Sequence, residues 1–172
     1  MLVLLLAAPL AWADFPATAN VNGAQLPKSS EGLLRWKGLF KVYEAALYKS
    51  PVTQGYTLGD GSTLRLELHY LRDLSAQDLV AATQGGFERV LPPGEGLARW
   101  QGELNKTLKT YRNVSRGDRY GLEVWPQGYR LTFNGEPVLT GTDEDYARRL
   151  LGLWLLPETP VPTLRSQLLV QR

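Results

Sequence analysis

Segments in which apolar and polar residues alternate occur in two groups along the chain, and two helical segments separate the groups. Residues 62–73 show the alternation most clearly, because every second residue from position 64 to position 70 is leucine or tyrosine and the residues between are polar. This spacing predicts a strand with one buried face and one polar face. Residues 34–48 predict two further strand pieces with a bulge or break at Gly38, and residues 19–26 predict a short edge strand followed by a turn.

Four helices are predicted, over residues 75–91, 96–114, 142–156 and 163–170. Ser75 and Asp78 have the spacing of a capping box at the start of the first helix. Residues 119–141 predict a meander of strands between the second and third helices. Strands and helices that are grouped in this way, without strand–helix–strand alternation, predict an α+β domain in which an antiparallel sheet carries helices on one face.

The first thirteen residues, MLVLLLAAPLAWA, resemble a secretory signal. They carry no charge and end in small residues, and their apolar core of about ten residues has the length of a signal segment. A transmembrane helix needs ~20 apolar residues, so we expect no stable membrane insertion after cleavage. The sequence therefore predicts a signal peptide over residues 1–13, a single domain over residues 14–172, and a periplasmic or otherwise exported protein.

The composition argues against several kinds of site. A chain of 172 residues with 44% hydrophobic residues can form one domain with a substantial core. It has no cysteine, which excludes disulfides and thiol nucleophiles. It has one histidine, His69, and no Gly-x-Ser-x-Gly motif, which argues against a serine hydrolase. We expect His69 to be solvated or paired across the sheet. The formal charge of +2 does not suggest a nucleic-acid partner. We expect no cofactor, because no phosphate-binding loop is present. We expect no metal, because the acidic residues 143–145 fit the start of a helix.

The stretch LFKVYEAALYKS, residues 39–50, places polar side chains inside a strongly apolar strand. Alternation puts Lys41 and Tyr43 on one face, and Arg35 joins them if a bulge at Gly38 preserves the alternation. Arg35, Lys41 and Tyr43 are therefore the candidate residues for binding the anionic head group of an apolar ligand. The alternative is that Lys41 and Tyr43 face water. Glu44 lies on the opposite face, and if it is buried it needs a basic partner on a neighbouring strand.

Two further pairs have a structural and a functional interpretation. Arg148 and Arg149 are expected to face solvent on an amphipathic helix, and an anion clamp is the alternative. Trp100 and Trp154 are expected in the core, and lining a ligand pocket is the alternative.

Three segments resemble the chalcone isomerase-like proteins, specifically their exported bacterial branch. The segments are GLLRWKGLFKVYEAALY, LELHYLRDLSAQDL and YARRLLGLWLLPETPVP, and with their surroundings they cover nearly all of the chain after the signal, in the right order. The resemblance implies an open-faced β-sandwich, in which a large antiparallel sheet is covered by helices on one face and a ligand cleft lies between them.

The resemblance implies two different uses of that cleft. Enzymes of this family close a chalcone to a flavanone, with an arginine, a strand threonine, a tyrosine and a late threonine. The strand threonine corresponds to Tyr43 here, the late threonine falls near Leu153, and the arginine falls near Glu31 unless a shift brings Arg35 into its place. A leucine cannot hydrogen-bond a developing oxyanion, so this pattern argues against isomerase activity.

Members of the family that bind fatty acids hold the carboxylate with an arginine and with a tyrosine in a K-V-Y context. Lys41-Val42-Tyr43 matches that context, with Arg35 as the nearest arginine and Lys41 as its substitute. We therefore expect a non-catalytic protein that binds a small amphiphilic, fatty-acid-like carboxylate. The alternatives are an intramolecular lyase and a ligand-free structural or partner-binding protein of the cell envelope, which would have a cleft filled by Trp100, Trp154 and their neighbours.

Overall fold

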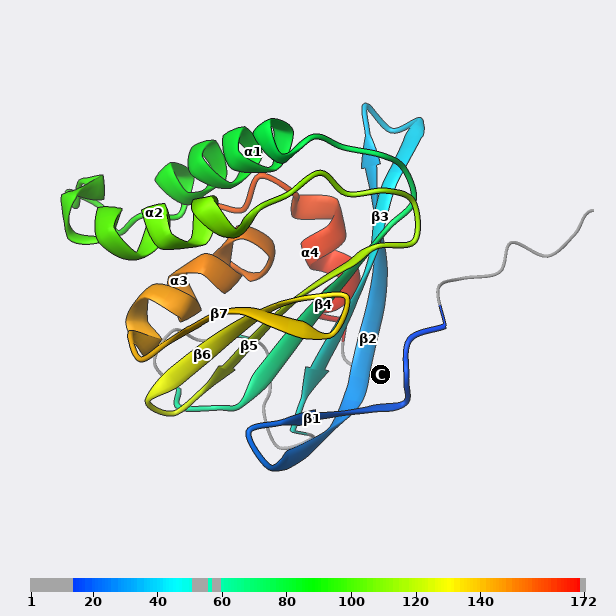
Figure 1. Ribbon diagram of the computed structural model, residues 1–172, viewed down its shortest axis with the longest axis horizontal. Helices are drawn as coiled ribbons and strands as arrows, with labels where there is room; N and C mark the ends of the chain where they lie inside the picture. Colours follow the sequence, from blue (N-terminus) through cyan, green and yellow to red (C-terminus); the bar gives the residue numbers. More distant parts are fainter. Residues whose placement is uncertain (1–13, 51–55, 57–59, 171–172) are drawn as a thin grey trace, which may run out of the picture.

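The computed structural model describes residues 14–50, 56 and 60–170, so the predicted signal segment lies outside the described residues. Within them, seven strands form one antiparallel sheet in which each strand pairs with the next along the chain (Figure 1). The strands are β1 (Thr18–Val21), β2 (Ala24–Trp36), β3 (Phe40–Lys49), β4 (Leu64–Tyr70), β5 (Arg119–Trp125), β6 (Gly128–Phe133) and β7 (Glu136–Gly141). The helices are α1 (Ala76–Arg89), α2 (Gln101–Thr110), α3 (Glu144–Leu155) and α4 (Pro162–Leu168), with a 3-10 turn at Leu97–Arg99 before α2.

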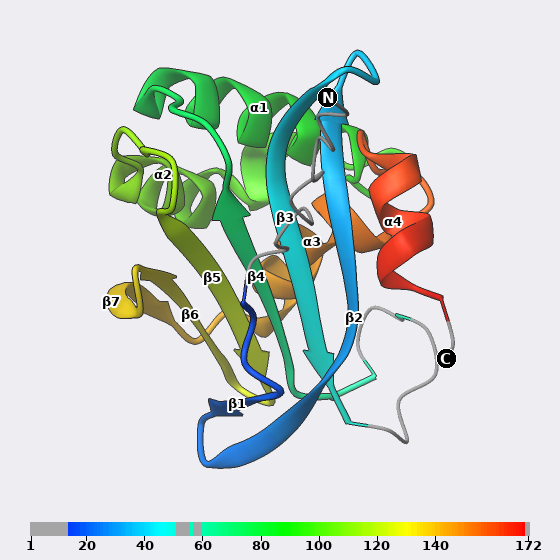
Figure 2. The ribbon, with the colours of Figure 1, turned by 90° about the vertical axis from the view of Figure 1, so that its right-hand side faces the viewer.

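The helices cover one face of the sheet, as Figures 1 and 2 both show. Helix α3 contacts β5 and β6, and α4 contacts β2 and β3. The main core lies between these layers and includes Leu47, Leu66 and Leu122, which point inward from three strands. The predicted open-faced β-sandwich is therefore confirmed. None of the described helices has both the length and the apolar character needed to cross a membrane.

Local sequence signals explain where the helices begin. Ser75 and Asp78 form the predicted capping box at the start of α1, and the Asp143 side chain accepts a hydrogen bond from the Tyr146 amide at the start of α3. Helix α1 runs through its two glycines without a break. A Cβ atom on Gly86 would lie 2.7 Å from Leu153 Cδ2, so this glycine allows α1 to pack closely against α3.

The opposite face of the sheet is partly covered by the start of the described chain. Phe15 and strand β1 pack over Ala46 and Tyr48 and form a second, smaller apolar cluster. On the same face His69 of β4 lies opposite Glu44 of β3, with 3.8 Å between His69 Nδ1 and Glu44 Oε2. Glu44 is buried, so His69 is the basic neighbour on an adjacent strand that the sequence did not identify, and the predicted cross-strand role of His69 is confirmed.

Gly38 lies in the hairpin turn between β2 and β3, so the predicted break between two strand pieces is confirmed and the alternative of a bulge at Gly38 is wrong. Lys37 and Gly38 have φ angles of 50° and 72° and connect β2 to β3. Trp36 pairs with Phe40, so three residues form the loop, and the Leu39 amide donates a hydrogen bond to the Trp36 carbonyl oxygen. The bulge lies at Val42 instead, because Tyr43 pairs with Leu34 whereas Lys41 pairs with the next residue, Arg35.

Arg148 is buried, so the prediction that it faces solvent is also wrong. Its side chain is 1% exposed, Nε lies 2.7 Å from Glu144 Oε1, and Nη2 donates a hydrogen bond of 2.8 Å to the Ser62 carbonyl oxygen. The segment that leads into β4 closes over this face of α3, which helical periodicity alone does not indicate. Arg149 is half-buried and donates to the Val90 carbonyl oxygen.

Candidate functional site

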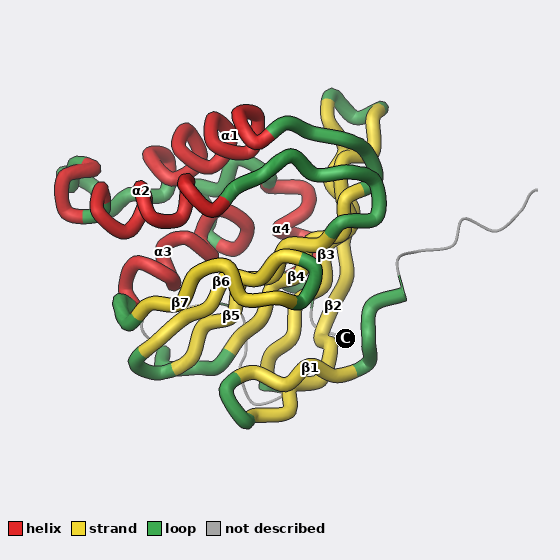
Figure 3. Tube along the Cα trace, viewed as in Figure 1, coloured by secondary structure: helices red, strands yellow, loops and turns green. Residues whose placement is uncertain are grey.

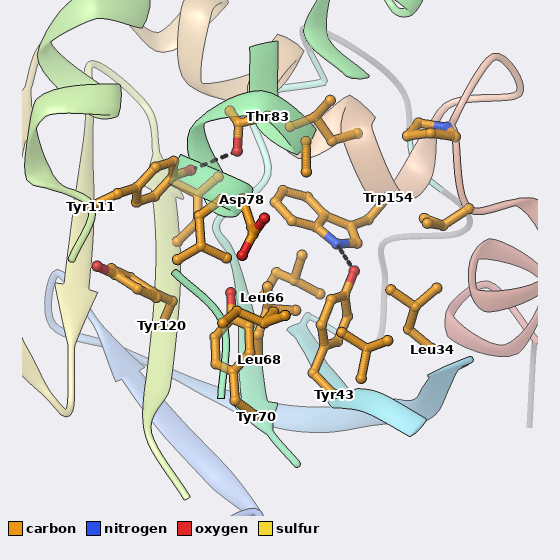
Figure 4. Close-up of a pocket in the computed structure, with 18 of the residues that line it drawn as sticks. Leu34, Tyr43, Leu66, Leu68, Tyr70, Asp78, Thr83, Tyr111, Tyr120 and Trp154 are labelled. Carbon is orange, nitrogen blue, oxygen red and sulfur yellow. Dashed lines mark hydrogen bonds between the residues drawn. The ribbon is translucent and has the colours of Figure 1, made fainter. Parts of the chain in front are cut away.

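A cavity of about 830 Å³ lies between the sheet and the helices (Figure 4). This volume falls within the range of small-molecule sites in proteins. Apolar side chains from both layers form most of its wall, among them Leu34, Val42, Leu66, Leu68, Leu79, Leu122, Leu131, Leu150, Leu153 and Val161. The cavity therefore offers a long apolar surface to a ligand.

The bulge in β3 shapes one end of this wall. Both Val42 and Tyr43 line the cavity, although neighbouring residues of a regular strand point to opposite faces. A bulge inserts one extra residue and re-aims the side chains beside it, which accounts for this pair. Tyr43 accepts a hydrogen bond of 2.9 Å at its hydroxyl from Trp154 Nε1 of α3, so the two layers are connected across the cavity.

Four tyrosines line the cavity, and their hydroxyl groups differ in their partners. Tyr111 shares a hydrogen bond with Thr83, and the Tyr120 hydroxyl accepts one from the Arg112 amide. Tyr43 is bonded to Trp154, as described above.

Tyr70 is the exception among the four. It is 4% exposed, and no hydrogen bond connects its hydroxyl to another described residue. Figure 4 shows this hydroxyl pointing from the floor of the cavity toward its interior. A hydroxyl that faces the cavity and has no hydrogen-bond partner in the described part of the chain is available to a polar atom of a ligand.

Burial also determines the charge of these phenols. It raises the pKa of Tyr70 well above the ordinary value and raises the pKa of Tyr111 to about 12. Burial likewise raises the pKa of Tyr43, although the hydrogen bond from Trp154 acts in the opposite direction. These tyrosines are therefore neutral hydrogen-bonding groups at physiological pH.

Exposed residues mark the open side of the cavity. They come from the end of the β2–β3 hairpin, with Arg35 and Lys37, and from the approach to α1, with Arg72 and Asp78. The mouth thus carries three cationic side chains and one carboxylate. The Asp78 carboxylate is held by the amide and hydroxyl of Ser75, and these hydrogen bonds lower its pKa.

The three residues predicted from the sequence occupy different positions. Tyr43 lines the cavity and Arg35 belongs to its exposed rim. Lys41 pairs with Arg35 across the hairpin, is half-buried, and is not among the described residues that form the wall. Trp154 lines the cavity, whereas Trp100 is buried outside it, so the two tryptophans do not fill the cleft.

Sequence reasoning missed Tyr70 and Arg72. Tyr70 was predicted only as a member of the buried face of its strand, and alternation does not show whether a buried hydroxyl finds a partner. Arg72 follows the end of β4 in a loop that runs beside the loop after α2 (Figure 3). Leu74 and Val114 exchange backbone hydrogen bonds between these two loops, which places Arg72 at the mouth.

In the described part of the chain, no three His, Asp or Glu side chains gather as metal ligands would. His69 lies on the other face of the sheet, beside Phe15. The functional groups of the cavity are therefore phenols, an indole and the charged rim.

Comparison with known proteins agrees with this architecture. The family model described as chalcone isomerase-like matches residues 7–170. The chain belongs to the chalcone isomerase-like family. Among solved structures, a fatty-acid binding protein of Arabidopsis thaliana shares the fold, with a TM-score of 0.70, 14% sequence identity and 90% of each chain covered. A search of curated proteins found no match.

This chalcone isomerase-like chain has its cavity where the family resemblance implies a cleft, between the sheet and the helices. Leu153, near the position of the late threonine of the isomerases, contributes an apolar side chain to the wall. Glu31, near the position of their arginine, forms an ion pair with Lys28 instead, with 2.5 Å between Lys28 Nζ and Glu31 Oε1.

Proposed function

We propose that this protein binds a small amphiphilic carboxylate of the fatty-acid type in the cavity and does not transform it. The observation that carries the proposal is the hydroxyl of Tyr70, which faces a mostly apolar cavity and has no hydrogen bond to another described residue. A few polar groups in a mostly apolar cavity are the arrangement expected for a ligand with a long apolar part and one polar end.

The apolar wall supplies most of the affinity in this proposal. Each buried methylene group of a ligand contributes about 0.8 kcal/mol, before the cost of association is subtracted. Leucines from four strands and from α3 provide the contact surface, and the cavity volume of about 830 Å³ accommodates a chain of many carbons.

The tyrosines and the cationic rim supply orientation. Tyr43 accepts its hydrogen bond from Trp154, so its own O–H remains able to donate to a ligand. The rings of Tyr43 and Tyr70 are 5.7 Å apart, and both lie near the hairpin that carries Arg35. A hydrogen bond to a charged group contributes about 1.5–3 kcal/mol, and Arg35, Arg72 and the nearby Lys41 provide positive charge for a carboxylate.

The absence of catalysis is supported by the same groups. A neutral phenol with a raised pKa does not act as a base near neutral pH. The single histidine lies on the far face of the sheet, and Asp78 at the mouth is bound to the start of α1. Leu153 adds no hydrogen-bond donor for an oxyanion.

The test compares Tyr70→Phe with Tyr120→Phe in a displacement assay with a fluorescent fatty acid. Tyr70→Phe should weaken binding of laurate by roughly tenfold or more, because the hydrogen bond to the carboxylate is lost. Tyr120→Phe is the matched control, since the Tyr120 hydroxyl already has the Arg112 amide as a partner. Dodecanol, which has the same chain without the charge, should lose less affinity in Tyr70→Phe than laurate does, because a hydrogen bond to a neutral group contributes less than one to a charged group. Failure of the wild-type protein to bind laurate would overturn the proposal.

We also infer that the protein acts after export. The uncharged apolar segment before Asp14 supports this, as does the anchoring of the chain just after it. Tyr48 donates a hydrogen bond to the Pro16 carbonyl oxygen and Lys28 donates one to that of Phe15. Mass spectrometry of the protein from its native host should give an N-terminus near Asp14, and a retained Met1 would contradict the inference.

A further inference from the structure

We propose that the tip of the β2–β3 hairpin docks on an anionic phospholipid membrane and that the cavity exchanges its ligand with that membrane. The tip consists of residues 36–40, Trp-Lys-Gly-Leu-Phe. The proposal names a source for the ligand and therefore rests on the proposed function. It concerns peripheral docking, without a segment that spans the membrane.

The first observation is the concentration of exposed apolar side chains on the tip. Among the described residues, four large apolar side chains are more than half exposed, and three of them belong to the tip: Trp36 at 54%, Leu39 at 75% and Phe40 at 51%. The fourth, Val170, lies beyond α4. Exposed apolar groups scattered singly are ordinary, whereas a cluster of this kind marks an interaction surface.

The second observation is the chemistry and shape of this cluster. The Trp36 and Phe40 rings are 5.9 Å apart, and Lys37 Nζ lies 4.4 Å from the centre of the Trp36 ring. Aromatic rings with adjacent cations suit the boundary between lipid head groups and acyl chains, where rings are buried and cations meet phosphate. Arg35 and Lys41 flank the tip on the two strands, so three cations surround the apolar group.

The third observation is the residue used in the turn. Three hairpins of the sheet place a residue and a following glycine at positive φ, and two of them use Asn, at Asn22-Gly23 and Asn134-Gly135. Asparagine is favoured in this conformation, and a lysine is not. Lys37-Gly38 places a cation at the exposed end of the hairpin despite that preference.

The fourth observation connects the tip with the cavity. Trp36 and Lys37 belong both to the tip and to the rim of the cavity, and Arg35 belongs to the same rim. In Figures 1 and 2 the hairpin projects at the same end of the molecule as the start of α1, which forms the other side of the mouth. A membrane contacted by the tip is therefore adjacent to the opening.

A membrane fits this tip better than a protein surface does. A stable protein interface uses about 20–30 residues on each side, whereas the tip presents five residues at the end of one hairpin. A lipid surface needs only a few inserted side chains and an attractive charge. The mouth also carries Asp78, but its carboxylate is bonded to Ser75 at the start of α1, and three cationic side chains belong to the same rim.

The test measures co-sedimentation of the full protein, after removal of residues 1–13, with vesicles of phosphatidylglycerol or of phosphatidylcholine. The wild type should bind the anionic vesicles, with a blue shift of tryptophan emission. It should bind the zwitterionic vesicles at least tenfold more weakly, because each cation near an anionic surface contributes about fivefold. Leu39→Ser combined with Phe40→Ser should reduce binding to the anionic vesicles by roughly tenfold or more. Val170→Ser, at the other exposed apolar residue, should leave it unchanged.

Laurate binding measured by calorimetry without vesicles separates this inference from the proposed function. The double variant should bind laurate as the wild type does, because neither Leu39 nor Phe40 lines the cavity. Laurate binding without vesicle binding in the wild type would overturn the docking inference and leave the proposed function standing. The docking inference would also be overturned if the double variant bound vesicles as well as the wild type does. The same holds if the wild type is a dimer that the double substitution converts to a monomer.

Discussion

Trp154 of α3 donates a hydrogen bond from Nε1 to the hydroxyl oxygen of Tyr43 on β3, at 2.9 Å, across the cavity. Tyr43 is 8% exposed, and its ring contacts that of Tyr70 in an edge-on arrangement with the centroids 5.7 Å apart. The contact fixes one helix relative to one strand and leaves the Tyr43 proton free for a ligand.

Tyr43→Phe should lower the free energy of unfolding by about 1 kcal/mol, because it leaves the indole N–H of Trp154 without its partner. A double-mutant cycle with Trp154→Phe, followed by urea unfolding, should give a coupling energy of similar size. Tyr70→Phe is the control. It should leave the stability of the ligand-free protein equal or slightly higher, since the hydroxyl that it removes has no partner among the described residues. A coupling energy near zero would contradict the prediction.

Gly32→Ala and Gly85→Ala should change stability in opposite directions. A Cβ atom at Gly32 would lie 2.6 Å from Leu164 Cδ1 and 3.0 Å from Gln167 Cβ, so α4 would have to move away from β2, at a cost of about 1–3 kcal/mol. Gly85 is exposed in the middle of α1 with open space around it, and alanine there should stabilise the protein by about 0.5–1 kcal/mol. Thermal unfolding measures both changes, and equal effects would show that the packing at Gly32 is not tight.

Acidification should destabilise the protein in part through His69. Burial and then the charge of Arg119 lower the pKa of His69 below its ordinary value, although Glu44 acts in the opposite direction. The unfolded chain therefore binds a proton more readily than the folded protein. The contribution of His69 to the free energy of unfolding is present above the unfolded pKa of about 6.5, and it is lost as the pH falls through and below that value. In His69→Gln, denaturation midpoints should depend less on pH between about 7 and 5.

A separate loss of stability should follow at lower pH in both proteins. Burial acts to raise the pKa of Glu67, but hydrogen bonds from Arg119 and Arg65 hold it below its ordinary value. This contribution is present above the unfolded pKa of about 4.3 and is lost as the pH falls further. An identical pH dependence of wild type and His69→Gln down to pH 5 would contradict the role assigned to His69.

The protein should not accelerate the closure of a chalcone to a flavanone. The tyrosines of the cavity are neutral because burial raises their pKa values, and Leu153 offers no hydrogen bond to an oxyanion. The loss of chalcone absorbance should proceed at the spontaneous rate. Turnover above that rate which disappears in Tyr43→Phe or Arg35→Ala would make the protein an intramolecular lyase.

Local patterns in the sequence were sufficient to predict most of the fold. The alternation in residues 62–73, the capping box at Ser75 and Asp78 and the grouping of strands and helices all correspond to elements of the structure. Each of these patterns reflects the repeat of a single element or the termination of one helix, so it needs no information about distant residues. The family resemblance added the cleft between sheet and helices, which the structure contains.

Long-range pairing decided the rest. Three features depend on which strand, helix or loop lies opposite a residue. They are the missing partner of the Tyr70 hydroxyl, the bulge of β3 at Val42 and the burial of Arg148. Gly38 shows the same limit, because a glycine inside an apolar stretch is compatible with either a bulge or a turn until the pairing of β2 with β3 is known. Hydrogen bonds and burial are properties of groups that meet in space, and groups more than a hundred positions apart, such as Tyr43 and Trp154, are brought together only by the folded sheet and its helices.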